Sequence, residues 1–151
     1  MKVFRVYVEN SVVGGYFDKE FEVATKLLFD MFRKGLFKPV ISTHVIKELD
    51  DGAPIRVIEN LKTIDYEMAE VDEEVLSLAK SYIDEGVVSE QFYGDALHVA
   101  IATVSEVDVL VSWNCKHINN LHKIKLFNAI NLKNGYRMLE IRNPEEVLRN
   151  E

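Results

Sequence analysis

Three acidic residues and one asparagine occupy positions where a divalent cation could be held. Glu9 ends an apolar run, Glu48 lies in a helical pattern after a second run, and Asp95 opens a strongly apolar helical pattern. Asn114 follows a further short apolar run. Carboxylate and amide oxygens that converge without a phosphate-binding loop suit Mg²⁺ or Mn²⁺. Such an ion polarises a phosphoryl oxygen and lowers the pKa of a bound water, which is the chemistry that phosphodiester hydrolysis requires.

Each of the four residues also has a structural interpretation, because acids and amides are common at the ends of elements for capping reasons. An exposed strand end, a surface ion pair, a helix cap and a turn would account for Glu9, Glu48, Asp95 and Asn114 respectively. For any one residue alone, the structural role is favoured. A shared site is favoured only if the fold brings all four together, so the arrangement of the elements decides the question.

The apolar residues recur with periods that predict strands alternating with helices. Strands are expected at 3–9, 37–41, 107–112 and 138–141, with a weaker one at 68–71. Helices are expected at 20–34, 45–49, 54–61, 73–85, 94–104, 120–133 and from Pro144, with a turn-rich loop at 10–15. This alternation predicts an α/β sandwich around a mostly parallel sheet. Sites in such folds lie beyond the carboxyl ends of the strands, which is where the four residues fall.

Length and composition favour one globular domain that spans 1–151. The chain is 48% hydrophobic and 28% charged, which excludes a disordered segment. Cys115 is the only cysteine, so no intramolecular disulfide can form, and this suits a reducing compartment. The sequence has no secretory leader pattern and no apolar run near the ~20 residues of a membrane helix. We therefore expect a cytoplasmic protein that does not contact a membrane.

The formal net charge of −7 argues against a protein that coats nucleic acid passively. The charge is uneven, because residues 115–142 carry six basic residues and one acid. Such a stretch can steer a polyanion to one face of an acidic protein. A solvated helix face explains it equally well.

Four segments resemble those of the PIN domain family. The segment VFRVYVENSVVGGYF is similar to the opening strand and loop, with a hydroxyl residue after the acid, and PVISTHVIKEL is similar to the second strand and its helix. The most specific match is YGDALHVAIATVSEVDVLVSWNCKHINN, and IRNPEEVL resembles the last strand and helix. The resemblance covers nearly the whole chain and implies a three-layer α/β/α sandwich.

The resemblance also implies metal-dependent cleavage of RNA with Mg²⁺ or Mn²⁺, frequently by the toxin of a VapBC-type toxin–antitoxin pair. It implies an antitoxin protein as partner and a homodimer. Carried over by position, the catalytic metal ligands are Glu9, Glu48, Asp95 and Asn114, with Ser11 and Ser112 as hydrogen-bonding support. Residues of the basic stretch would guide the RNA, and those expected to do so are Lys116, Lys123 and Lys125.

Two residues depart from the family pattern, which usually has aspartate at both positions. Glu9 is one methylene longer, and Asn114 lacks the negative charge. A ligand displaced by ~1 Å can cost ~10²-fold in rate. The alternative interpretation is therefore a PIN-like module that binds RNA or protein with weakened or lost catalysis.

Other constellations are less specific. Cys115 and His117 with His122 could begin a zinc site but lack a fourth ligand at a standard spacing. His98 lies one turn after the opening acid of its helix and could approach the site, although a packed or interface histidine is favoured. Trp113 could stack on a base, with packing against the sheet favoured. No glycine-rich phosphate loop is present, so a nucleotide-binding domain is not expected.

Overall fold

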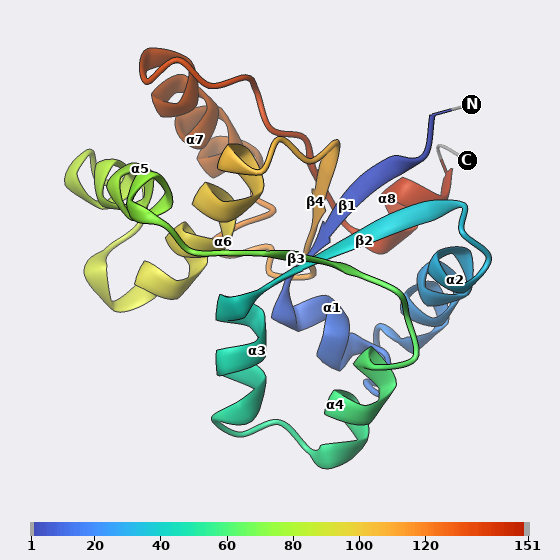
Figure 1. Cartoon of the computed structure of the whole chain (residues 1–151). Helices are drawn as coiled ribbons and strands as arrows, with labels where there is room; N and C mark the ends of the chain where they lie inside the picture. The colour runs from blue at the N-terminus through green and yellow to red at the C-terminus, as the bar shows by residue number, and fades with distance from the viewer. Residues whose placement is uncertain (1, 150–151) are drawn as a thin grey trace.

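A five-stranded parallel sheet organises residues 2–149, which the computed structural model describes (Figure 1). The strand order is β3-β2-β1-β4-β5, and every neighbouring pair is parallel. The strands are β1 (Phe4–Val8), β2 (Phe37–Ser42), β3 (Glu67–Ala69), β4 (Val109–Val111) and β5 (Ile141–Arg142). This confirms the predicted α/β architecture.

Helices cover both faces of this sheet and give the three layers that the resemblance implied. In chain order they are α1 (Asn10–Gly15), α2 (Glu22–Arg33), α3 (Thr43–Asp50), α4 (Ile55–Leu61), α5 (Glu73–Asp84), a 3₁₀ turn (Glu90–Phe92), α6 (Tyr93–Val104), α7 (Leu121–Lys133) and α8 (Pro144–Arg149). Figure 1 shows α5, α6 and α7 on one side and α1, α2 and α8 on the other. Helices α3 and α4 contact α1. None of the described helices is both long and apolar enough to cross a membrane.

Local capping explains where several helices begin and end. The side chain of Ser42 accepts a hydrogen bond from the Val45 amide at 3.0 Å, and Asp72 accepts one from the Val75 amide at 2.9 Å. These bonds satisfy amides that have no partner inside the helix. Gly35 follows α2 with a φ of 74°, a left-handed conformation that other residues rarely adopt. The helices predicted at 20–34 and 73–85 accordingly end and begin close to the predicted bounds.

The core lies on both sides of β1 and reaches the end of the sheet where the strands finish. Val6, Tyr7 and Val8 have no exposed surface. Every residue of α6 from Ala96 to Thr103 is buried, because this helix packs between the sheet and α5. A helix that is buried on all sides carries apolar residues on all sides, as the strongly apolar pattern at 94–104 indicated for α6. The body of α6, which carries Asp95 in its first turn, is consequently anchored in the core.

One predicted element is wrong. Residues 10–15 were expected to form a loop, but they form α1. The carbonyl of Glu9 accepts hydrogen bonds from the amides of Val12 and Val13, whose side chains are fully buried. Burial of two valines stabilises a helix that the glycines at its end disfavour. The last strand is also shorter than predicted and is confined to Ile141–Arg142.

Ser42 has a double role, and its removal should lower stability. Its Oγ accepts the Val45 amide and lies 2.9 Å from the Tyr7 hydroxyl in the core. We expect Ser42→Ala to cost about 1–3 kcal/mol of unfolding free energy, since a helix cap is lost and a buried hydroxyl loses a partner. Urea unfolding measures this. Ser77→Ala, on the exposed face of α5, is the matched control, and an equal effect of both would contradict this role.

Candidate functional site

The carboxyl ends of the two central strands place Glu9 beside Ser112. Val8 and Val111 are paired in register as the last residues of β1 and β4. The next residues, Glu9 and Ser112, are therefore neighbours on the same edge of the sheet. Both side chains are buried, with exposed fractions of 4% and 0%.

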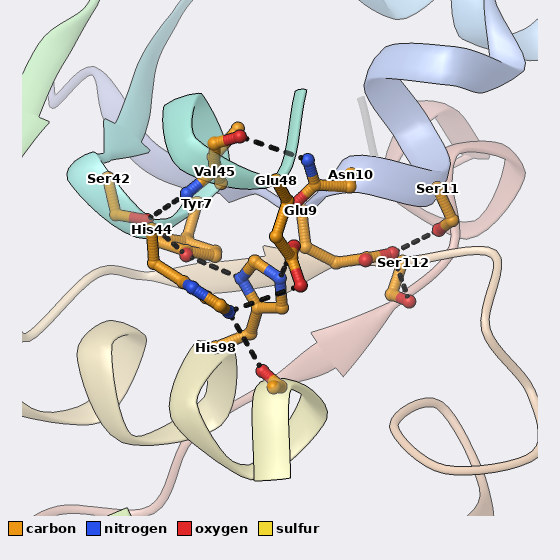
Figure 2. Close-up of polar contacts among 11 residues, drawn as sticks. Tyr7, Glu9, Asn10, Ser11, Ser42, His44, Val45, Glu48, His98 and Ser112 are labelled. Atoms are coloured by element: carbon orange, nitrogen blue, oxygen red, sulfur yellow. Dashed lines mark hydrogen bonds and ion pairs between the residues drawn. The ribbon is translucent and has the colours of Figure 1, made fainter. Parts of the chain in front are cut away.

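Two serine hydroxyls fix the Glu9 carboxylate, as Figure 2 shows. Ser112 donates to its Oε1 at 2.7 Å, and Ser11 donates to the same oxygen. Each serine is oriented in turn, because Ser11 accepts the Trp113 amide at 2.8 Å and Ser112 accepts the Asn114 amide at 2.9 Å. The buried carboxylate thus has defined hydrogen bonds to Oε1, and no partner of Oε2 is observed among the described residues.

Asp95 lies half-buried in the first turn of α6, within electrostatic reach of the other acids. Burial raises its pKa, and the negative charges of Glu9 and Glu48 raise it further, whereas His98 and His117 oppose this shift. Carboxylates that raise the pKa of a neighbour repel one another in their ionised forms. A bound cation would remove that repulsion. The carboxylates of Glu9 and Asp95 are the oxygen donors that Mg²⁺ and Mn²⁺ prefer, so these residues fit such an ion.

Glu48 reaches this edge from α3 but is held by two histidines (Figure 2). Its Oε1 lies 2.7 Å from Nε2 of His98, and its Oε2 lies 3.3 Å from Nε2 of His44. His98 is 1% exposed, and its Nδ1 lies 2.7 Å from the Tyr7 hydroxyl. The hydroxyl of Tyr7 also contacts Ser42, so a continuous polar chain runs from β2 through the core to Glu48.

Burial and hydrogen bonding determine the protonation states of the residues in this hydrogen-bonded network. Burial raises the pKa of Tyr7, so its hydroxyl remains neutral. Burial also lowers the pKa of His44, and the nearby charge of His98 lowers it further. Although burial alone would raise the pKa of Glu48, the hydrogen bond from His98 holds it below its ordinary value. Glu48 is therefore an ionised carboxylate in contact with imidazole nitrogens.

Asn114 stabilises a turn, which was the structural alternative to metal binding for this residue. Its Oδ1 accepts the amides of Lys116 at 3.2 Å and His117 at 3.0 Å. These bonds use the lone pairs that a cation would need. Its backbone lies beside Ser112 at the site, and its part in metal binding stays a prediction.

Much of the basic stretch is engaged within the protein. The ammonium group of Lys123 donates to the Val87 carbonyl at 2.7 Å, so a structural contact accounts for this residue. Three other cations form ion pairs with acids, namely Lys133 with Glu85, Arg137 with Glu106 and Arg142 with Glu140. Lys116 and Lys125 are exposed. The contact of Lys116, Lys123 and Lys125 with RNA stays a prediction for all three lysines.

The side chains of Trp113 and His117 both pack against other aromatic rings. Trp113 stacks on Phe21 with ring centroids 4.5 Å apart and donates to Thr25 at 3.0 Å. His117 stacks on Phe92 at 3.7 Å, and the described residues show no metal-like grouping of it with Cys115.

Sequence reasoning missed His44, although one signal was available. His44 and Glu48 are four residues apart on α3 and therefore share a face. Their approach to His98 depends on the packing of α3 against α6, which spacing along one helix does not reveal.

Comparison with known proteins supports the fold. No known family matches the chain by its sequence profile, and no curated protein is a significant sequence match. Among solved structures, a similar chain comes from the crystal structure of VapBC2 from Rickettsia felis bound to a DNA fragment from their promoter. The two chains are 16% identical with a TM-score of 0.56, and the match covers 91% of this chain and 98% of the other. At this identity the likeness concerns the fold alone.

Proposed function

We propose that this protein is a metal-dependent ribonuclease that hydrolyses RNA phosphodiesters with a water activated by Mg²⁺ or Mn²⁺. One observation carries the proposal. Glu9 follows β1, Glu48 lies on α3 and Asp95 lies in the first turn of α6, and the charges of Glu9 and Glu48 add to the effect of burial in raising the pKa of Asp95. The three carboxylates do not form a ready ligand group among the described residues, so a bound ion would draw them closer. An edge that carries buried and half-buried carboxylates suits a divalent cation.

The protein's own residues would hold and orient the reacting groups. When bound, the ion supplies a polarised phosphoryl oxygen and a water of lowered pKa. Glu9 is held rigidly by Ser11 and Ser112, so its carboxylate keeps one position without reorganisation. Asp95 lies on the buried helix α6, which restricts its movement. Exposed Lys116 and Lys125 would attract the RNA backbone.

The experiment is a cleavage assay on labelled single-stranded and hairpin RNA, using chelator-treated protein with and without added Mn²⁺. We expect cleavage that appears with Mn²⁺ or Mg²⁺ and disappears with chelator. Calorimetry should detect Mn²⁺ binding to the same preparation. The proposal fails if the wild type neither cuts RNA nor binds Mn²⁺.

Adding a negative charge at Asn114 should strengthen metal binding. Asn114→Asp keeps the oxygen that accepts the amides of the turn and adds one charge. A unit charge near a solvated divalent ion contributes on the order of 1–2 kcal/mol, so we expect the Kd for Mn²⁺ to fall about tenfold. Asn134→Asp, on the exposed end of α7, is the matched control. Unchanged affinity in calorimetry would remove Asn114 from the site.

We further propose that the protein acts as the toxin of a toxin–antitoxin pair in the cytoplasm and forms a homodimer. The likeness of its fold to a chain of the VapBC2 structure supports this. Co-expression with the product of an adjacent small reading frame should give a stable complex that no longer cleaves RNA. Light scattering of the free protein should give twice the mass of 17.4 kDa. Cleavage that is unaffected by every neighbouring gene product would contradict the toxin assignment.

The pairing of Glu48 favours a second candidate, a PIN-like module that binds RNA or protein without cleaving it. Both oxygens of Glu48 already contact histidines, and Oδ1 of Asn114 is used by a turn. This candidate predicts RNA binding in gel shift that is unaffected by Mn²⁺ and no cleavage product.

A further inference from the structure

We propose that His44, Glu48 and His98 form a second cation site, selective for ions of the Zn²⁺ class over Mg²⁺. One ligand atom from each residue lies within 4.8 Å of the others, and the described residues contain no further grouping of this kind. The inference rests on these three side chains and does not depend on the nuclease proposal, although Glu48 belongs to both sites.

The donor chemistry separates this site from the acidic one. Two imidazole nitrogens and one carboxylate suit Zn²⁺ and related first-row ions, whereas Mg²⁺ prefers oxygen ligands. Three protein ligands that leave one position open are the usual set of a catalytic or exchangeable zinc site. The side chain of Glu48 is 38% exposed, so ions can enter from the solvent.

The existing separations are near those of a metal site, and binding requires the side chains to adjust, because the two short contacts use different oxygens of Glu48. Zn²⁺ binds nitrogen and oxygen at about 2.0–2.2 Å, which sets tetrahedral ligand atoms roughly 3.3 Å apart. Glu48 Oε2 and His44 Nε2 are already 3.3 Å apart, and Glu48 Oε1 and His98 Nε2 are 2.7 Å apart. The ligands lie on α3 and α6, which hold them without a flexible loop.

Hydrogen bonds behind His98 allow the tautomer that a metal needs. A metal-binding histidine donates its other ring N–H to an acceptor. Nδ1 of His98 can donate to the Tyr7 hydroxyl at 2.7 Å, while that hydroxyl donates to Ser42 at 2.9 Å. Nε2 then presents its lone pair toward Glu48. In the other arrangement Tyr7 donates to Nδ1, and His98 donates to Glu48, so the same chain satisfies the metal-free state.

Gly94 keeps the space between the two helices open. A Cβ at this position would lie 3.1 Å from Oε2 of Glu48 and 3.6 Å from Nε2 of His44. Its carbonyl accepts from His44 at 3.2 Å in the arrangement where that nitrogen carries a proton. An added methyl group would therefore crowd the ligands directly.

Occupancy has a functional consequence. An ion at this site takes the carboxylate of Glu48 away from the edge that Glu9 and Asp95 share. Zn²⁺ should therefore oppose any activity that needs Glu48 at that edge.

The test measures Zn²⁺ binding directly. Chelator-treated protein is titrated with Zn²⁺ by calorimetry, and with Co²⁺ by visible absorption, whose intensity reports coordination number. We expect one ion to bind per chain. The bound Co²⁺ should show the intense visible absorption of a four-coordinate ion, and millimolar Mg²⁺ should not compete for the site. His44→Ala should weaken Zn²⁺ binding by at least about tenfold, because loss even of a group that only orients a metal ligand costs ~10–100-fold. Tyr7→Phe should weaken it within that range.

Controls keep the inference falsifiable. His98→Gln provides a second ligand variant if His44→Ala does not fold, as judged by circular dichroism. His117→Ala should leave the affinity unchanged, and loss of Zn²⁺ binding there would overturn the proposal in favour of a Cys115 site. Unchanged affinity in folded His44→Ala or His98→Gln would also overturn it. Asp95→Asn should retain Zn²⁺ binding while losing RNA cleavage. Failure of the nuclease proposal can therefore be distinguished from failure of the zinc-site proposal.

Discussion

Asp95→Asn should reduce RNA cleavage by at least about 10²-fold, because it removes a charged oxygen ligand while preserving the shape of the side chain. Asp95 lies in the first turn of α6, and the charges of Glu9 and Glu48 act on it. Neutralising it should also weaken Mn²⁺ binding in calorimetry. Single-turnover cleavage of labelled RNA at saturating protein measures the chemical step.

A matched control and a stability measurement separate catalysis from folding. Asp65→Asn changes a side chain that is 99% exposed and should leave the rate unaltered. The raised pKa of Asp95 means that its ionised form opposes folding at neutral pH, and that this cost disappears as acid protonates it. The variant should therefore melt no lower than the wild type at pH 7. Full cleavage by Asp95→Asn would remove this residue from the mechanism.

Leu110→Ala should be among the most destabilising substitutions in the chain. Leu110 is fully buried on β4, the strand that positions Ser112. Truncating such a leucine removes apolar contacts and leaves a cavity, which costs about 2–5 kcal/mol. For a domain of this size the melting temperature should fall by about 10 °C. Urea unfolding at 25 °C gives the free energy directly.

Leu121→Ala is the appropriate control, since Leu121 is 74% exposed at the start of α7. It should change the unfolding free energy by no more than about 0.5 kcal/mol. Equal losses in the two variants would contradict the assignment of β4 to the centre of the core.

The parts of the fold set by local chemistry were predictable. Ser42 and Asp72 cap helices and Gly35 ends one, and such bounds follow from the local sequence because these residues act on neighbouring backbone groups. The short apolar run around Leu110 predicted a central parallel strand. Placement of Glu9 beside Ser112 followed from the shared carboxyl edge of parallel strands.

The features that depend on contacts between distant elements were not predictable. Burial of Val12 against the core turns a turn-rich segment into α1. The contact of Lys123 with Val87 depends on how α7 packs beside the end of α5. The pairing of Glu48 with His98 joins residues fifty positions apart. Hydrophobic periodicity describes one helix or strand at a time. It therefore indicated where Glu48 lies in its helix but not which residues of other elements contact it.

The most direct test of the central claim is where Mn²⁺ binds. Substoichiometric Mn²⁺ added to ¹⁵N-labelled protein broadens amide signals close to the ion. The shared site predicts that the amides of Glu9, Asp95 and Ser112 broaden first, while those of the acidic first turn of α5, Glu73 and Glu74, persist. Broadening that begins at α5, or that spreads evenly over the acidic surface, would contradict a metal site at the carboxyl edge of the sheet.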